Sequence, residues 1–167
     1  MISRFFTFEE HATLIEGAYH FPLVILSLMV AVFASFMAFN VAGQAAITED
    51  KLRRNTLLGT GSVALGGGIW SMHFLGMTAF DLCLPVDYDP LITGLSAVPG
   101  FAAAWVALHL LTKSRISLAE IILGGVLVGA GIGTMHYSGM AAMEMAPLLR
   151  YDLGMFALSI VVAVCLA

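Results

Sequence analysis

The chain has 167 residues, of which 60% are hydrophobic and only 11% are charged, and its net charge is −4. A soluble domain of this size carries about a quarter charged residues, so this composition excludes an ordinary water-soluble globule and predicts a protein surrounded by the lipid bilayer. The seven lysines and arginines form no broad basic patch, which argues against nucleic acid as a partner.

Five apolar runs, taken in chain order, predict transmembrane helices. A helix needs about 20 apolar residues to cross the hydrocarbon layer, and four runs have that length. These four extend over about 21–43, 57–80, 91–112 and 118–142. A fifth run begins near Leu153 and is still apolar at Ala167, so we expect the sequence to be part of a longer protein. The predicted fold class is an all-α integral membrane bundle with four complete spans and a fifth.

The basic residues predict how these spans are oriented. Five of the seven lie within 51–54 and 113–115, in the connections after the first and the third run. Because cytoplasmic loops are enriched in lysine and arginine, both connections are predicted to face the cytoplasm. The N-terminus of this multi-pass chain is then on the outer, periplasmic side.

An internal repeat divides the chain into similar units. Residues 66–77 match residues 129–140 at seven of twelve positions, with an offset of 63. A tyrosine followed eight residues later by a serine opens each odd-numbered run, at Tyr19, Tyr88 and Tyr151. The unit is predicted to be a helical hairpin, with repeat 1 over about 19–81, repeat 2 over about 88–144, and repeat 3 beginning at 151 and cut off. Glycines in the second and fourth runs predict that these two helices form the inner pair.

Each repeat carries a histidine, a methionine and a carboxylate at intervals of four residues. Because positions i and i+4 share a face of a helix, each of the two helices presents these side chains in one direction. At 1.5 Å per residue, both histidines lie roughly 28–32 Å from the basic connections, near the outer interface. Imidazole and thioether groups suit copper, and thioethers suit Cu(I) in particular. The candidate metal ligands are His20, His73, His136, Met72, Met77, Met135 and Met140.

Other interpretations of these residues stay open. Methionine is also an ordinary filler of helical cores, and the two motif histidines could hold haem in an electron carrier. Zinc in a membrane hydrolase and a copper transport path are further alternatives. The sequence contains no G-x-S-x-G, Walker or H-E-x-x-H motif, so this segment is not predicted to be an enzyme.

Two segments, Met72-His73-Phe74 and Met135-His136-Tyr137, resemble the Met-His-Tyr-Thr motif of the MHYT domain, a membrane domain of bacterial signalling proteins. The resemblance covers essentially the whole chain from Tyr19, although Phe74 replaces tyrosine, and Leu75 and Ser138 stand where threonine would. It implies six or seven spans in the inner membrane, formed by three hairpins. It also implies a cytoplasmic output domain that is absent from this sequence, such as a GGDEF or EAL module for cyclic-di-GMP turnover, or a kinase.

The same resemblance implies a function. Copper would lie near the outer face, held by residues of the two motifs, and the domain would sense a diatomic gas (O2, CO or NO) or a redox or metal state. The ligands implied in this way are Met72, His73, Met135 and His136. A second copy of the chain is a further candidate partner.

Overall fold

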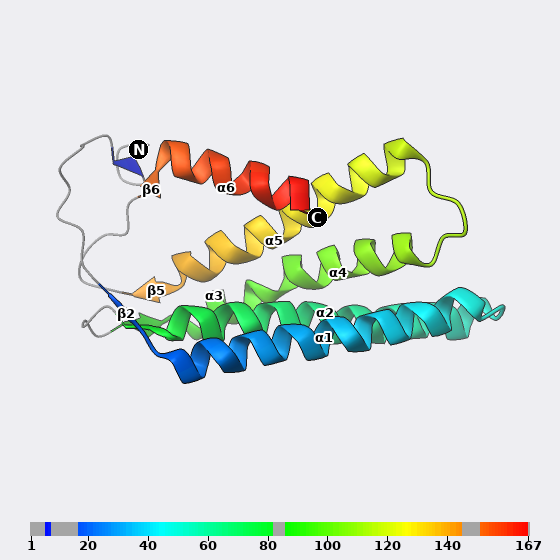
Figure 1. Ribbon diagram of the computed structural model, residues 1–167, viewed down its shortest axis with the longest axis horizontal. Coiled ribbons are helices and arrows are strands. Elements are labelled where there is room, and N and C mark those ends of the chain that lie inside the picture. Colours follow the sequence, from blue (N-terminus) through cyan, green and yellow to red (C-terminus); the bar gives the residue numbers. More distant parts are fainter. Residues whose placement is uncertain (1–5, 8–16, 82–85, 145–150, 167) are drawn as a thin grey trace.

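Six helices make up most of the computed structural model, which describes residues 6–7, 17–81, 86–144 and 151–166 (Figure 1). In chain order the helices are α1 (Phe21–Ile47), α2 (Lys51–Thr78), α3 (Pro90–Leu95), α4 (Ala97–Leu111), α5 (Leu118–Ala141) and α6 (Leu153–Leu166). Within this described part, three stretches are long and apolar enough to cross a membrane, namely α1, α3 with α4, and α5. The prediction of a helical fold is therefore confirmed, and three of the four complete spans have the expected length and composition.

The second predicted span corresponds to α2, which is long but not sufficiently apolar to join the other three. Its 28 residues include six glycines and, in the first turn, three basic residues. Because glycine adds no apolar side chain, the mean hydropathy of α2 is lower than that of the three other helices. Only in its length does α2 resemble them. The span assigned to α2 stays a prediction, as does the span assigned to the shorter apolar helix α6.

Local sequence signals determine where the helices begin and end. The Asp50 side chain accepts a hydrogen bond from the backbone N–H of Leu52 at the start of α2. Ser117 and Glu120 form a reciprocal capping box at the start of α5. A break at Ser96 divides the predicted third run into α3 and α4. Pro99 explains this break, because proline has no N–H to donate to the carbonyl four residues earlier.

The helices are stacked so that α4 lies between α2 and α5. On one side α2 packs against α1 and α4, and on the other α5 packs against α4 and α6. Figure 1 shows α5 running obliquely to α4 and meeting the α2 side near the strands at one end. The second and fourth runs therefore do not form the inner pair that their glycines suggested. Instead, α2 packs mainly on α1 and then on α4, and α5 packs mainly on α4, where small residues of α4 face both helices.

Glycines allow this close packing. A Cβ atom built on Gly66 of α2 would lie 2.8 Å from the Cα of Phe101 and 2.9 Å from the carbonyl oxygen of Gly100. A Cβ atom on Gly131 of α5 would lie 3.0 Å from the carbonyl oxygen of Pro99. Helix backbones approach this closely only where side chains are absent, and close packing is what holds helices together in lipid. The buried core is correspondingly rich in alanine, and one cluster within it comprises Ala38, Ala42, Ala45, Leu58 and Leu108.

Three pairs of two-residue strands lie beside the helices (Figure 1). They are β1 (Phe6–Thr7) parallel to β6 (Tyr151–Asp152), β2 (Ala18–Tyr19) antiparallel to β3 (Phe80–Asp81), and β4 (Asp87–Tyr88) antiparallel to β5 (Met143–Glu144). In register, Tyr19 lies opposite Phe80 and Tyr88 lies opposite Met143. The two antiparallel pairs join the start of each repeat to its end.

Equivalent backbone hydrogen bonds extend these two pairs. The N–H of His20 donates to the carbonyl of Ala79 at 2.7 Å, and the N–H of Asp89 donates to the carbonyl of Ala142 at 2.9 Å. Each bond joins the residue after the repeat's opening tyrosine to the sixth residue after its motif histidine. We call these two hydrogen bonds the repeat clamps.

Replacing Gly66 by alanine should destabilise the bundle, because the new methyl group would meet the backbone of α4. We expect a loss of about 1–3 kcal/mol, measured as a lower thermal unfolding midpoint in detergent. Gly67→Ala is the matched control, since its methyl group would meet only the ring of Phe101 at 3.7 Å. That variant should keep or raise the midpoint, because alanine favours helix by up to about 1 kcal/mol over glycine. Equal midpoints for the two variants would contradict the packing described here.

Candidate metal centre

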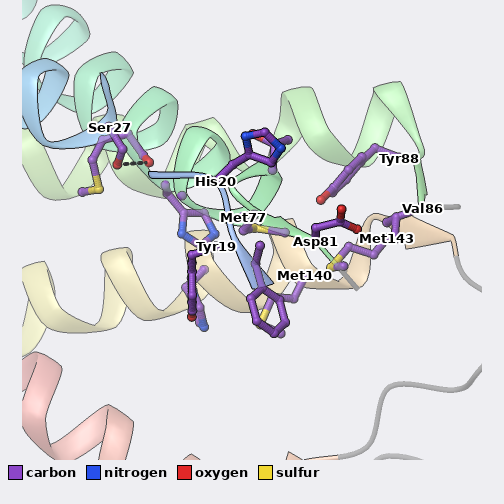
Figure 2. A pocket seen from close by; sticks show the side chains of 15 residues that line it. Tyr19, His20, Ser27, Met77, Asp81, Val86, Tyr88, Met140 and Met143 are labelled. Carbon is purple, nitrogen blue, oxygen red and sulfur yellow. Dashed lines mark hydrogen bonds between the residues drawn. The ribbon is translucent and has the colours of Figure 1, made fainter. Parts of the chain in front are cut away.

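A pocket of about 680 Å³ lies at the end of the bundle that carries the antiparallel strand pairs. Its walls come from both repeats, with residues of β2, α1, α2 and β3 on one side and of β4, α5 and β5 on the other. Figure 2 shows that the side chains of Met77, Asp81, Tyr88 and Met140 belong to one group that lines this pocket. The donor atoms in the wall are therefore imidazole nitrogens, thioether sulfurs, a carboxylate and phenols.

The two motif histidines meet in this pocket. The ring centroids of His73 on α2 and His136 on α5 are 4.8 Å apart, and the ring planes are inclined by 62°. Both rings are half-buried. The Nε2 atom of His73 is buried and has no hydrogen-bond partner among the described residues. Because a buried polar atom without a partner is costly, this nitrogen is suited to receive a ligand.

The aromatic residue of each motif packs against its own histidine. The rings of His73 and Phe74 meet edge to face with centroids 5.7 Å apart, and those of His136 and Tyr137 do so at 4.9 Å. Each motif aromatic also packs against a ring of the following repeat: Phe74 contacts Tyr88, and Tyr137 contacts Phe156. The motif aromatics therefore support the imidazoles.

The serines eight residues after the opening tyrosines all bond to a motif helix. In each repeat the serine lies beside α2 or α5, the helices that carry the Met-His-aromatic segments. Its hydroxyl donates or accepts a hydrogen bond there. The bonds run from Ser27 Oγ to the Met72 carbonyl at 2.8 Å, from Trp70 Nε1 to Ser96 Oγ at 3.0 Å, and between the hydroxyls of Tyr137 and Ser159 at 2.5 Å. The repeated tyrosine–serine spacing therefore has a structural purpose that the sequence did not explain.

The structure places six of the seven candidate ligands in the pocket wall. These six are His20, Met72, His73, Met77, His136 and Met140, and His20 among them is an exposed residue at the start of α1. The seventh, Met135, is 2% exposed and does not line the pocket. Its sulfur lies against Gly100 of α4, 3.2 Å from where a Cβ atom of that residue would be. Met143 also lines the pocket and was not among the predicted ligands.

The remaining polar residues limit what the pocket can bind. In the described part of the chain, no three histidine, cysteine, aspartate or glutamate side chains are close enough together to hold a metal ion. Among protein donor atoms, the pocket wall adds thioether sulfurs to the two imidazoles. Burial raises the pKa of the Tyr88 phenol above its usual value, so this phenol stays protonated near neutral pH and is able to donate a hydrogen bond.

The sequence of this chain matches one protein family over most of its length. The family is described as a bacterial signalling protein N-terminal repeat, MHYT, and its model matches residues 66–124 and 129–167. The chain belongs to the MHYT family. The two matches begin 63 residues apart, which equals the offset between the two motifs. The resemblance recognised from the two Met-His-aromatic segments is confirmed.

Curated relatives of this MHYT chain are much longer proteins. It is 40% identical to the bifunctional diguanylate cyclase/cyclic di-GMP phosphodiesterase MucR of Pseudomonas aeruginosa, over 89% of this chain and 22% of MucR. It is 34% identical to the cyclic di-GMP phosphodiesterase NbdA of the same species and 31% identical to the signaling protein YkoW of Bacillus subtilis. These two alignments cover 85% and 90% of this chain, and 18% of each relative. The chain thus spans about a fifth of the length of these relatives. No solved structure matches it.

The different positions of Met135 and Met140 predict different effects on stability. Met135→Ala should destabilise the MHYT chain by about 2–5 kcal/mol, because it opens a cavity between α4 and α5. Met140→Ala should cost clearly less, because the lost volume joins an existing pocket. Thermal unfolding of both variants in detergent checks this order, and a larger loss for Met140→Ala would contradict the orientation of the two side chains.

Proposed function

We propose that this chain is the membrane-integrated sensory part of a longer signalling protein, and that it holds copper near its outer face. The observation that carries the proposal is the meeting of His73 and His136, from two separate repeats, within one methionine-lined pocket. The buried and unpartnered Nε2 atom of His73 supports it, because this atom gains a partner when a metal binds. The residues proposed to hold the metal are His73 and His136 with the thioethers of Met77 and Met140.

The donor set favours copper over the alternatives. Imidazole with thioether is a combination that suits copper, and Cu(I) especially. Structural and catalytic zinc sites draw on histidine, cysteine and carboxylate ligands, and no trio of those is gathered in the described part of the chain. Haem is disfavoured because ring centroids 4.8 Å apart leave no room for a porphyrin between the two imidazoles. When bound, copper would supply a redox-active centre able to bind a diatomic gas such as O2, CO or NO.

The other predicted ligands have different roles in this proposal. Met72 and His20 lie in the pocket wall and are further ligand candidates. Met135, whose sulfur faces α4, is proposed to pack in the core rather than to bind copper. His20 is exposed and stands at the start of α1, so any metal contact it makes would be at the edge of the pocket.

The chain's own aromatic contacts supply a way to transmit a change at the site. The ring of His136 packs against Tyr137, and Tyr137 packs against Phe156 on α6. A shift of the imidazole is therefore passed to α6 by direct contact. We propose that the chain continues from there to a cytoplasmic output domain that makes or degrades cyclic di-GMP. The names of MucR and NbdA support this output, and the segment itself is proposed to have no enzymatic activity.

The basic connections support an orientation. Their basic residues lie in the first turn of α2 and between α4 and α5, at the ends of these helices remote from the two motif histidines. We propose that this end faces the cytoplasm of a bacterial cell and that the pocket opens on the periplasmic side of the inner membrane.

Copper binding is the first test of the proposal. The purified chain, loaded with Cu(I) and washed, should retain the metal by elemental analysis, and His73→Ala or His136→Ala should remove most of it. Met140→Leu should weaken binding by about tenfold or more, corresponding to the loss of one ligand worth roughly 1.4 kcal/mol. Leucine has nearly the volume of methionine, so folding should survive the change.

Met135→Leu is the matched control for this experiment. It removes a thioether from the same helix, but from the face that packs on α4. It should retain copper at the level of the unchanged protein. A wild-type chain without copper, or equal losses for Met135→Leu and Met140→Leu, would overturn the proposed ligand set.

Signalling is the second test, and it uses the complete protein in cells. His73→Ala combined with His136→Ala should make the cellular cyclic di-GMP level insensitive to copper chelation and to the candidate gases. The Met135→Leu protein should respond as the unchanged protein does. A double histidine variant that still responds normally would show that the pocket is not the sensor.

A further inference from the structure

A second polar pocket lies away from the metal centre, where the α1–α2 and α4–α5 connections come together. Its volume is about 440 Å³. One arginine of this pocket comes from α2, and a lysine and a second arginine come from the α4–α5 connection. Hydroxyl groups lie beside these three cations. The residues that matter here are Arg54, Lys113, Arg115, Thr48, Thr112 and Ser114. The sequence showed no broad basic patch because these residues belong to two connections that lie far apart in the chain.

The cations of this pocket are not equally neutralised. Lys113 forms an ion pair with Glu120 at 2.6 Å, so its charge is largely compensated. Arg54 is half-buried, and its Nη2 atom donates to the Thr112 hydroxyl at 3.1 Å, which fixes the guanidinium at the pocket wall. Arg115 is exposed and forms no ion pair within the described residues. Two arginines thus provide uncompensated positive charge.

Apart from Glu120, which pairs with Lys113, the acidic residues of the α1–α2 connection line a separate depression. Glu49 and Asp50 line a neighbouring pocket together with Arg53, and they do not line the one that contains Arg54. The basic pocket therefore combines uncompensated guanidinium groups with the hydroxyl of Ser114, since the hydroxyls of Thr48 and Thr112 already donate to backbone carbonyls. This is the donor set that recognises a phosphate group, because the planar guanidinium fork matches phosphate oxygens.

The surroundings of the pocket indicate where such a phosphate would come from. The pocket lies where α1 and α4 end and α5 begins, at the limit of three apolar helices. The large apolar side chains of Ile47, Leu111 and Leu118 are exposed at these helix ends. We propose that this pocket binds the phosphate of an anionic phospholipid headgroup, with the acyl chains lying along the exposed apolar side chains. Basic pockets between helices at a membrane surface bind lipid headgroups in this manner.

The test compares lipids on the purified chain in detergent by native mass spectrometry. Phosphatidylglycerol should bind, and phosphatidylcholine should bind much more weakly. Arg54→Gln and Arg115→Gln should each weaken phosphatidylglycerol binding about fivefold, and the double variant about 25-fold, from roughly 1 kcal/mol per cation. Arg53→Gln, the adjacent arginine on α2 that lines the neighbouring pocket, is the matched control and should leave binding within about twofold.

The arms of this experiment separate the outcomes. If added inorganic phosphate displaces phosphatidylglycerol and shows the same dependence on Arg115, the phosphate site is supported, and free phosphate is a second source of its ligand. Equal binding of the two lipids would overturn the proposal, and so would equal losses for Arg53→Gln and Arg115→Gln. Arg115→Gln decides the matter even if Arg54→Gln is unstable, because only Arg54 also bonds to Thr112.

Discussion

Close backbone contact between α4 and the two motif helices determines where the histidines meet. In lipid, apolar side chains gain little by burying one another, so helices associate through tight packing at small residues. Gly66 brings α2 against α4 and Gly131 brings α5 against α4, on two faces of that helix. Because α4 separates α2 from α5 along most of their length, the two motif helices come together only near their ends, where His73 and His136 are in contact.

Duplication accounts for much of the candidate metal centre. Each repeat contributes one motif histidine, one methionine four residues later and one clamp between the end of its motif helix and the start of the unit. Neither repeat alone supplies two motif histidines, so the contact between His73 and His136 exists only because two copies of the same hairpin face one pocket. The antiparallel strand pairs and their repeat clamps matter for the same reason. They place the residues that follow each motif helix, including Asp81 and Met143, at the pocket wall.

Periodicity and repetition were sufficient to predict the helices and most of the candidate site. Apolar runs gave most helix ends to within four residues, although α2 begins at Lys51, six residues before the predicted run, because its first turn is polar. The i, i+4 spacing placed His73 with Met77 and His136 with Met140. Two-residue strands could not be predicted, because they carry no periodic pattern, and the break at Ser96 depends on one proline. The orientation of Met135 also required the structure: its direction relative to His136 follows from helix geometry, but which helix lies in that direction depends on tertiary packing. The same holds for the basic pocket, which brings two distant connections together.

Phenylalanine at position 74, where the second motif has Tyr137, makes the two halves of the candidate metal centre unequal. Tyr137 contacts α6 through its ring and through a hydroxyl bond to Ser159, whereas the ring of Phe74 packs against those of Trp70, His73 and Tyr88. The two repeats are therefore nearly symmetric in sequence but not in their side-chain links: a phenyl ring has no hydroxyl, so position 74 cannot form the bond that Tyr137 forms with Ser159 of the third unit.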